Sequence, residues 1–192
     1  LFASMFTRQT LILVPALLAI TAGWGIFLGL GPLYASSELG WEKATYSGWG
    51  AQAFLVSGIG AAIILGPAAG WCGARRMFIA GGVLVTVAAG FMLIMRPSWG
   101  DPILFIGAIY VFTALAVLRS VSAGSMTMRL CNPAIAATQF SVFMAILNIG
   151  RTMGAASLGW LDALGGIPAM FAAIGICGLV AAVFAYAAKV GR

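Results

Sequence analysis

The chain has 192 residues, of which 62% are hydrophobic and 7% are charged. Because soluble domains carry about 25% charged residues, this composition excludes a soluble globular protein and indicates an integral membrane protein embedded in the lipid bilayer. The net charge of +6 comes from lysines and arginines scattered along the chain, which argues against a nucleic-acid partner and favours topology determinants.

Six apolar stretches follow one another along the chain, each close to the ~20 residues that a helix needs to cross the ~30 Å hydrocarbon core. We predict a single all-α transmembrane domain over residues 1–192. Its spans are expected at about residues 11–34, 46–71, 77–95, 103–126, 138–161 and 167–188. Pro15 and Pro67 lie inside spans and predict kinks, because proline lacks the N–H that continues a helix.

Charged residues outside the spans divide unequally between the two sides of the membrane. With both termini on one side, that side holds the basic residues Arg8, Arg75, Arg76, Arg129, Lys189 and Arg192. The other side holds Lys43 and Arg96, together with all four acidic residues. Since basic loops stay in the cytoplasm, we expect both termini to be cytoplasmic.

The chain contains no histidine, which excludes histidine metal ligands, a histidine general base and a Ser/His dyad. Its three cysteines are far apart and form no CxxC pair, so we expect free thiols. No catalytic residue, metal site or cofactor is therefore expected, and we do not expect an enzyme.

A weak internal repeat links the two halves of the chain. The second span contains Ile59-Gly60 and ends near Gly70-Trp71, and the fifth contains Ile149-Gly150 and ends near Gly159-Trp160. The interval of 90 residues divides the chain into two three-helix units. Such three-plus-three repeats form each six-helix half of a major facilitator transporter.

The turn after the second span reads GPAAGWCGARR. It resembles the major facilitator motif GxxxD-(R/K)-x-G-R-(R/K), with matches at Gly66, Gly73, Arg75 and Arg76. Gly70 stands where the motif has its acid, so the charge relay of that motif is absent. The alternative interpretation is an ordinary short basic loop.

A longer match begins after the fourth span. The pattern CN-x4-ATQF, followed by GR and then GW, resembles the corresponding helix of the muropeptide permease and acetyl-CoA transporter branch of the major facilitator superfamily. The matching residues are Cys131, Asn132, Ala137, Thr138, Gln139, Phe140, Gly150, Arg151, Gly159 and Trp160. The resemblance implies a C-terminal half of a usually proton-coupled carrier in a bacterial inner membrane, for an anionic muropeptide or acyl-CoA-like solute.

Arg151 is the main candidate site residue. It lies about 20 Å from the Thr138 end of the fifth span and shares a helical face with Asn148. A guanidinium in hydrocarbon costs several kcal/mol, so we expect it to face protein or a watery cavity. Its planar guanidinium can donate two parallel hydrogen bonds to a carboxylate or phosphate, which predicts substrate binding. The alternative is a structural contact with helix-end carbonyls or a neighbouring helix.

Four other residues in or beside the spans leave alternatives open. Arg119 could bind substrate or extend to the cytoplasmic headgroups. Asn132 and Gln139 are expected to cap and anchor the fifth span, with a substrate role as the alternative, and Trp24 could line a central cavity or simply pack. No acid lies at the centre of a span, so a proton relay would have to come from a missing N-terminal half.

Two functions therefore stay open. One is half of a major-facilitator-type secondary transporter, which needs a second half to move solute. The other is a non-transporting accessory subunit of a larger membrane complex, with Arg151 as an internal tie. Six further spans upstream of Leu1 would favour the transporter, and a reading frame that starts near Met5 would favour the subunit.

Overall fold

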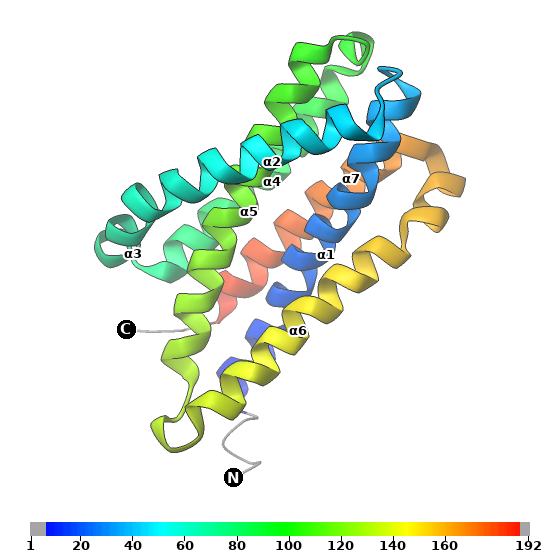
Figure 1. Cartoon of the computed structure of the whole chain (residues 1–192). Helices are drawn as coiled ribbons and strands as arrows, with labels where there is room; N and C mark the ends of the chain where they lie inside the picture. Colours follow the sequence, from blue (N-terminus) through cyan, green and yellow to red (C-terminus); the bar gives the residue numbers. More distant parts are fainter. Residues whose placement is uncertain (1–6, 189–192) are drawn as a thin grey trace.

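The computed structural model describes residues 7–188, so Lys189 and Arg192 of the predicted basic side lie outside the described residues. Over this range the chain is helical throughout and contains no strand. Its helices are α1 (Arg8–Ser37), α2 (Lys43–Gly60), α3 (Gly66–Cys72), α4 (Ala74–Ile94), α5 (Pro102–Leu130), α6 (Ala136–Ala156) and α7 (Leu158–Ala187) (Figure 1).

Six of the described helices are long and apolar enough to cross a membrane. They are α1, α2 with its continuation to Leu65, α4, α5, α6 with the turn that precedes it, and α7. The predicted all-α class and the predicted number of membrane-spanning helices are confirmed. The protein is an integral multi-pass membrane protein.

The fifth and sixth spans meet at a different place from the one expected. We predicted a fifth span to residue 161, but α6 ends at Ala156, where the Ser157 hydroxyl donates a hydrogen bond of 2.7 Å to the Gly154 carbonyl. The next helical segment is interrupted at Gly165 and Gly166, whose φ values are 173° and 65°. The positive φ of Gly166 favours glycine, and the long regular part of α7 follows it.

A π-helical turn, Ala61–Leu65, separates α2 from α3. Pro67 lies in the first turn of α3 and cannot donate to the carbonyl four residues earlier, so one hydrogen bond of a regular helix is missing there. The interruption falls where the sequence predicts a kink. Gly73 then joins α3 to α4 with a φ of 82°, again a conformation that glycine adopts readily.

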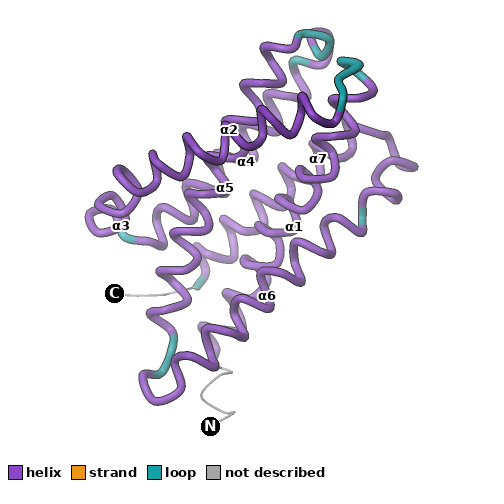
Figure 2. Tube along the Cα trace, viewed as in Figure 1, coloured by secondary structure: helices purple, strands orange, loops and turns teal. Residues whose placement is uncertain are grey.

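The connections gather at two opposite ends of the bundle (Figure 2). One end, which we call the basic end, holds the start of α1, the α3–α4 turn and the α5–α6 connection, with Arg8, Arg75, Arg76 and Arg129. The opposite, acidic end holds the other three connections, with Glu38, Glu42, Asp101 and Asp162.

Helix pairing places α1, α7 and α4 in a row. α1 packs against α6 and α7, α4 packs against α5 and α7, and α2 packs against α5. Glycine allows α4 and α7 to approach closely, because a Cβ on Gly82 of α4 would lie 2.7 Å from the carbonyl oxygen of Gly178 on α7. Thr86 also donates a hydrogen bond of 2.9 Å to the Gly175 carbonyl. Such small-residue contacts hold helices together in lipid, where the hydrophobic effect does not.

An aromatic core fills the acidic end of the bundle. Tyr34 of α1 stacks on Phe105 of α5, with ring centroids 4.2 Å apart. Its hydroxyl donates a hydrogen bond of 2.9 Å to the Trp99 carbonyl, and the Trp99 indole donates one of 2.8 Å to the Met92 carbonyl. These bonds satisfy polar atoms that burial would otherwise leave unpaired.

One face of the bundle is not covered by the described chain. In the most apolar stretch of α2, 12% of residues are buried, and in that of α6, 17%, against 33–44% in the other four spans. Figure 1 views the molecule with α2 and α6 in front and the fainter α4 and α7 behind. α2 and α6 therefore flank a surface that another molecule or lipid must cover.

Candidate functional site

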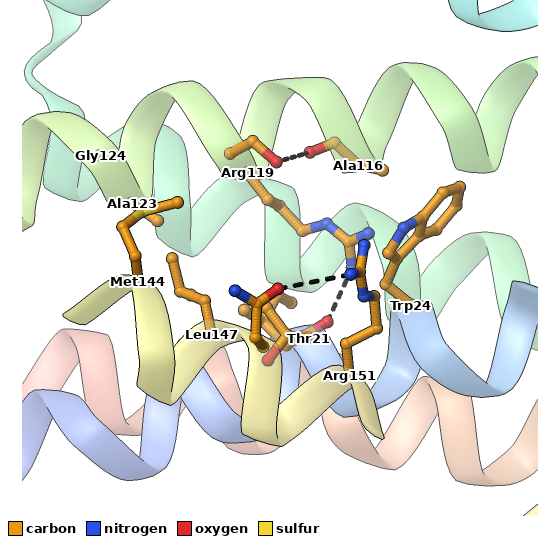
Figure 3. A pocket seen from close by; sticks show the side chains of 12 residues that line it. Thr21, Trp24, Ala116, Arg119, Ala123, Gly124, Met144, Leu147 and Arg151 are labelled. Atoms are coloured by element: carbon orange, nitrogen blue, oxygen red, sulfur yellow. Dashed lines mark hydrogen bonds between the residues drawn. The ribbon is translucent and has the colours of Figure 1, made fainter. Parts of the chain in front are cut away.

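A cavity of about 240 Å³ lies between α1, α5 and α6 (Figure 3). Arg119 reaches it from α5 and Arg151 from α6, and Trp24 forms part of its wall on α1. The complete lining is Ile20, Thr21, Trp24, Ala116, Arg119, Ser120, Ala123, Gly124, Met144, Leu147, Asn148 and Arg151. The cavity is therefore an apolar pocket with two guanidinium groups in it.

Arg119 is held inside the bundle. Only 5% of its surface is exposed, its Nε donates a hydrogen bond of 2.9 Å to the Leu115 carbonyl, and its Nη1 donates one of 3.4 Å to the Ile20 carbonyl. Gly81 of α4 makes room for it, since a Cβ there would lie 3.0 Å from Cγ of Arg119. The alternative in which Arg119 extends to the headgroups is therefore wrong, because its side chain bonds to backbone in the bundle interior.

Two of the five N–H donors of Arg119 are used by these carbonyls. Its Nη2 makes no hydrogen bond within the described chain, yet no fully buried side-chain nitrogen or oxygen of the described residues lacks a partner. Nη2 is therefore accessible, and the accessible space beside Arg119 is the cavity. A nearly buried cation thus presents free donors to a possible ligand.

Arg151 faces the same cavity from the opposite wall. Its Nη2 donates a hydrogen bond of 3.3 Å to Oδ1 of Asn148, the residue predicted to share its helical face. Its side chain is exposed in the described chain and forms no bond there to a helix-end carbonyl. Lining a cavity is what the sequence analysis expects of a guanidinium in a membrane span. Whether that cavity binds substrate stays a prediction.

Glycines on α1 and α6 set the position of Arg151. A side chain on Gly25 would collide with the carbonyl oxygen of Arg151, and one on Gly154 would collide with the carbonyl oxygen of Ala22. Gly150 likewise lies against Thr21. α6 therefore approaches α1 closely over the turn from Gly150 to Ala155, which fixes where the Arg151 side chain leaves the helix.

The cavity is positively charged. Its lining contains no aspartate or glutamate, and its hydroxyls are already engaged, with Thr21 donating to the Leu17 carbonyl at 2.8 Å and Ser120 donating to the Ala116 carbonyl at 2.9 Å. Among the lining side chains, the uncommitted hydrogen-bond donors are N–H groups of the two arginines, the Asn148 amide and the Trp24 indole, and of these only the arginines carry charge. Charge-assisted bonds from guanidinium to an anion are among the strongest hydrogen bonds in proteins, so this arrangement is suited to binding an anion.

A second, shallow cavity, open to the outside and lined by residues of α5 alone, continues from the first along this helix. The two share Ser120 and Gly124, and the second reaches Met128 and Arg129 at the basic end. Ser120, Thr21 and Arg129 were not predicted from the sequence to line a cavity. The spacing Ala116–Ser120–Gly124, each four residues apart on one helical face, is the signal that could have found this part of the wall.

The loop-motif residues lie outside the cavity. Arg75 donates a hydrogen bond of 3.1 Å from Nε to the Ala185 carbonyl, bonds through Nη2 to the Tyr186 carbonyl, and lies 5.8 Å from the centre of the Tyr186 ring. Arg76 is exposed, and Gly66 and Gly73 begin α3 and the turn after it. Of the motif residues, Arg75 thus links α4 to the end of α7.

Asn132 and Gln139 anchor the start of α6. The Asn132 side chain accepts a hydrogen bond of 3.0 Å from the Ala134 N–H, and its backbone N–H donates one of 2.5 Å to Oε1 of Gln139. Neither residue lines the arginine cavity. This geometry agrees with the predicted capping and anchoring role.

Comparisons with protein-family models, with curated proteins and with solved structures give no match. Among the described residues, no group of three or more histidine, cysteine, aspartate or glutamate side chains is placed to hold a metal ion.

Proposed function

We propose that the chain is one half of a two-half secondary transporter, and that the cavity between α1, α5 and α6 forms one wall of its solute site. The main support for this proposal is that Arg119 and Arg151 both line a cavity that the described chain leaves open on one side. Asn148 and Arg151 are both exposed there. Exposing a guanidinium to acyl chains is costly, so a second protein half covers this face.

Helix pairing supports a three-plus-three arrangement of the major facilitator type. In such a repeat, α1, α2 and α4 correspond to α5, α6 and α7, in that order. The α1–α7 contact then corresponds to the α5–α4 contact, and the α1–α6 contact to the α5–α2 contact, and both of these contacts exist. The α4–α7 contact corresponds to itself. In such carriers two halves rock about a solute site near the middle of the membrane.

The charge of the cavity supports an anionic solute, in line with the muropeptide or acyl-CoA-like class that the sequence resemblance suggests. The distribution of basic residues supports cytoplasmic termini, and the sequence resemblance suggests a bacterial inner membrane. The described spans place no carboxylate in the cavity, so proton coupling is assigned to the second half.

A transport assay on the native assembly tests this proposal. Reconstituted into liposomes, the assembly is expected to take up a radiolabelled muropeptide or acetyl-CoA, and Arg151→Ala is expected to abolish uptake while the amount of folded protein stays the same. Arg76→Ala, an exposed arginine outside the cavity, is the matched control and should keep uptake. Uptake by Arg151→Ala at the wild-type rate would refute the proposed solute site.

A second candidate is a non-transporting accessory subunit. The observation that favours it is the bonding of Arg75 to the end of α7 within the same chain, which makes the loop motif a structural tie. In this case the native assembly would move neither solute, although this chain would be required for its assembly. Disruption of the assembly when this chain is deleted, combined with no uptake by the intact assembly, would select this alternative.

A further inference from the structure

We infer that the two-arginine cavity selects a dianion, specifically a terminal phosphate or pyrophosphate group, over a single carboxylate; this inference rests on the proposed function. It begins from Arg119, which is 95% buried (5% exposed) and keeps accessible donors at Nη2. Such a side chain has lost most of its hydration. An anion that bonds to Nη2 replaces that hydration and neutralises the charge.

Arg151 adds a second charge on the opposite wall. Its guanidinium makes one hydrogen bond, to the neutral side chain of Asn148, and the lining supplies no carboxylate to either arginine. A single carboxylate therefore neutralises only one of the two charges. A phosphate monoester carries about −1.5 to −2 charges at pH 7 and three acceptor oxygens, so it can accept bonds from both guanidiniums at once.

The remaining walls fit the uncharged body of such a solute. Trp24, Met144 and Leu147 line the cavity beside the arginines, and Trp24 stacks on Phe27 with ring centroids 5.6 Å apart. An aromatic or apolar group attached to the phosphate would pack against this wall. Larger solutes would extend into the second cavity towards Arg129, since the two cavities share Ser120 and Gly124.

Direct binding tests this selectivity without requiring transport. The purified native assembly in phosphatidylcholine nanodiscs is titrated calorimetrically with pyrophosphate, phenyl phosphate and acetate at one ionic strength. Pyrophosphate and phenyl phosphate are expected to bind at least about tenfold more tightly than acetate, because each offers charge-assisted bonds to both arginines. Equal affinity for acetate and phenyl phosphate would overturn the proposal.

Three variants locate the site. Arg151→Gln, at an exposed position that does not affect the core, is expected to weaken phenyl phosphate binding about tenfold to hundredfold. Arg119→Lys is expected to weaken it about tenfold, because lysine keeps the positive charge but lacks the planar guanidinium that donates two parallel hydrogen bonds. Arg76→Gln is expected to bind like the wild type. Unchanged binding in Arg151→Gln, or equal losses in Arg151→Gln and Arg76→Gln, would overturn the assignment.

A lipid headgroup is the other possible source of a phosphate group. Nanodiscs that contain phosphatidylglycerol distinguish the two, because a soluble solute should bind there with the same affinity as in phosphatidylcholine after correction for surface charge. Abolished phenyl phosphate binding in phosphatidylglycerol would identify a lipid site and overturn the proposal. If the native assembly binds phosphate but takes up no solute, the proposed transporter function is refuted and the proposed dianion selectivity is not. If it takes up a monocarboxylate but does not bind phosphate, the dianion selectivity is refuted and the transporter function is not.

Discussion

Nη1 of Arg119 on α5 donates a hydrogen bond of 3.4 Å to the carbonyl oxygen of Ile20 on α1. This bond joins the first and fourth spans at the wall of the cavity. It uses a cation that has no carboxylate partner in the lining and is almost fully buried. Burying an uncompensated charge opposes folding. The buried position of Arg119 is therefore better explained by ligand binding than by a contribution to the stability of the fold.

Replacing Arg119 by methionine separates these two roles. Arg119→Met removes the desolvated charge and keeps much of the side-chain volume, while two hydrogen bonds to backbone carbonyls are lost. We expect an unchanged or higher thermal midpoint together with loss of phenyl phosphate binding, since apolar replacements of buried charges are often neutral or stabilising. Thermal unfolding in nanodiscs measures the first and calorimetry the second. A strongly lowered midpoint with intact binding would make Arg119 a structural residue only.

Gly154 is expected to tolerate no larger residue. Gly154→Ala would place a methyl group against the Ala22 carbonyl oxygen, so α6 must move away from α1. The cost of such overpacking is about 1–3 kcal/mol, and the shift displaces Arg151 as well. Gly90→Ala on α4 is the control, because nothing lies within 4 Å of a Cβ there. Thermal midpoints that are equal for the two variants would contradict this account of the α1–α6 contact.

Arg75 is expected to matter for stability and not for binding. Arg75→Ala removes the bonds to the Ala185 and Tyr186 carbonyls at the end of α7, at a cost of about 1 kcal/mol for a partly exposed charged donor. We expect faster proteolysis at the end of α7 and unchanged anion affinity. Arg76→Ala, which removes an exposed neighbour, should change neither. Lost anion binding in Arg75→Ala would link the loop to the cavity.

Arg129 is expected to act on the rate at which the anion arrives. It is exposed at the basic end and lines the second cavity, so its charge attracts anions without contacting them in the first cavity. Arg129→Gln should lower the association rate several-fold at low salt, and the difference should shrink at high salt. Stopped-flow binding of phenyl phosphate measures both. A change confined to the dissociation rate would place Arg129 in contact with the ligand instead.

Cys131, between α5 and the turn before α6, gives a pH-dependent test of topology. Partial burial raises the pKa of its thiol, so a smaller thiolate fraction exists at neutral pH and maleimide labelling accelerates as the pH rises. Cys72 is exposed at the same end and provides a second labelling site. Single-cysteine variants labelled with a membrane-impermeant maleimide should react only from the cytoplasmic side. Labelling of either cysteine from outside intact cells would reverse the proposed orientation.

The sequence predicted what depends on one helix at a time. Apolar runs of sufficient length predicted six spans and an all-α class, and helical periodicity placed Asn148 beside Arg151. The turn at Ser157 was missed because small and apolar residues continue on both sides of it, so hydropathy alone shows no break there. Gly165 and Gly166 interrupt the next segment by backbone conformation, which an apolar pattern does not reveal.

The meeting of Arg119 with Arg151 depends on how helices pack. From the sequence, an arginine in the last third of a span could equally reach the headgroups. Two groups on other helices hold the Arg119 side chain inside the bundle. Gly81 on α4 leaves room for it, and the Ile20 carbonyl on α1 accepts its hydrogen bond. Both come from spans other than α5, so no local pattern around residue 119 contains this information.

The uncovered surface flanked by α2 and α6 also bears on biogenesis. If a second half covers it as proposed, a newly inserted copy without that half would hold Arg151 and Asn148 against acyl chains. Membrane quality-control proteases and chaperones recognise such a state by its exposed polar groups. The cellular amount of this polypeptide should therefore follow the supply of whatever covers that surface, and an excess copy should have a shorter lifetime than an assembled one.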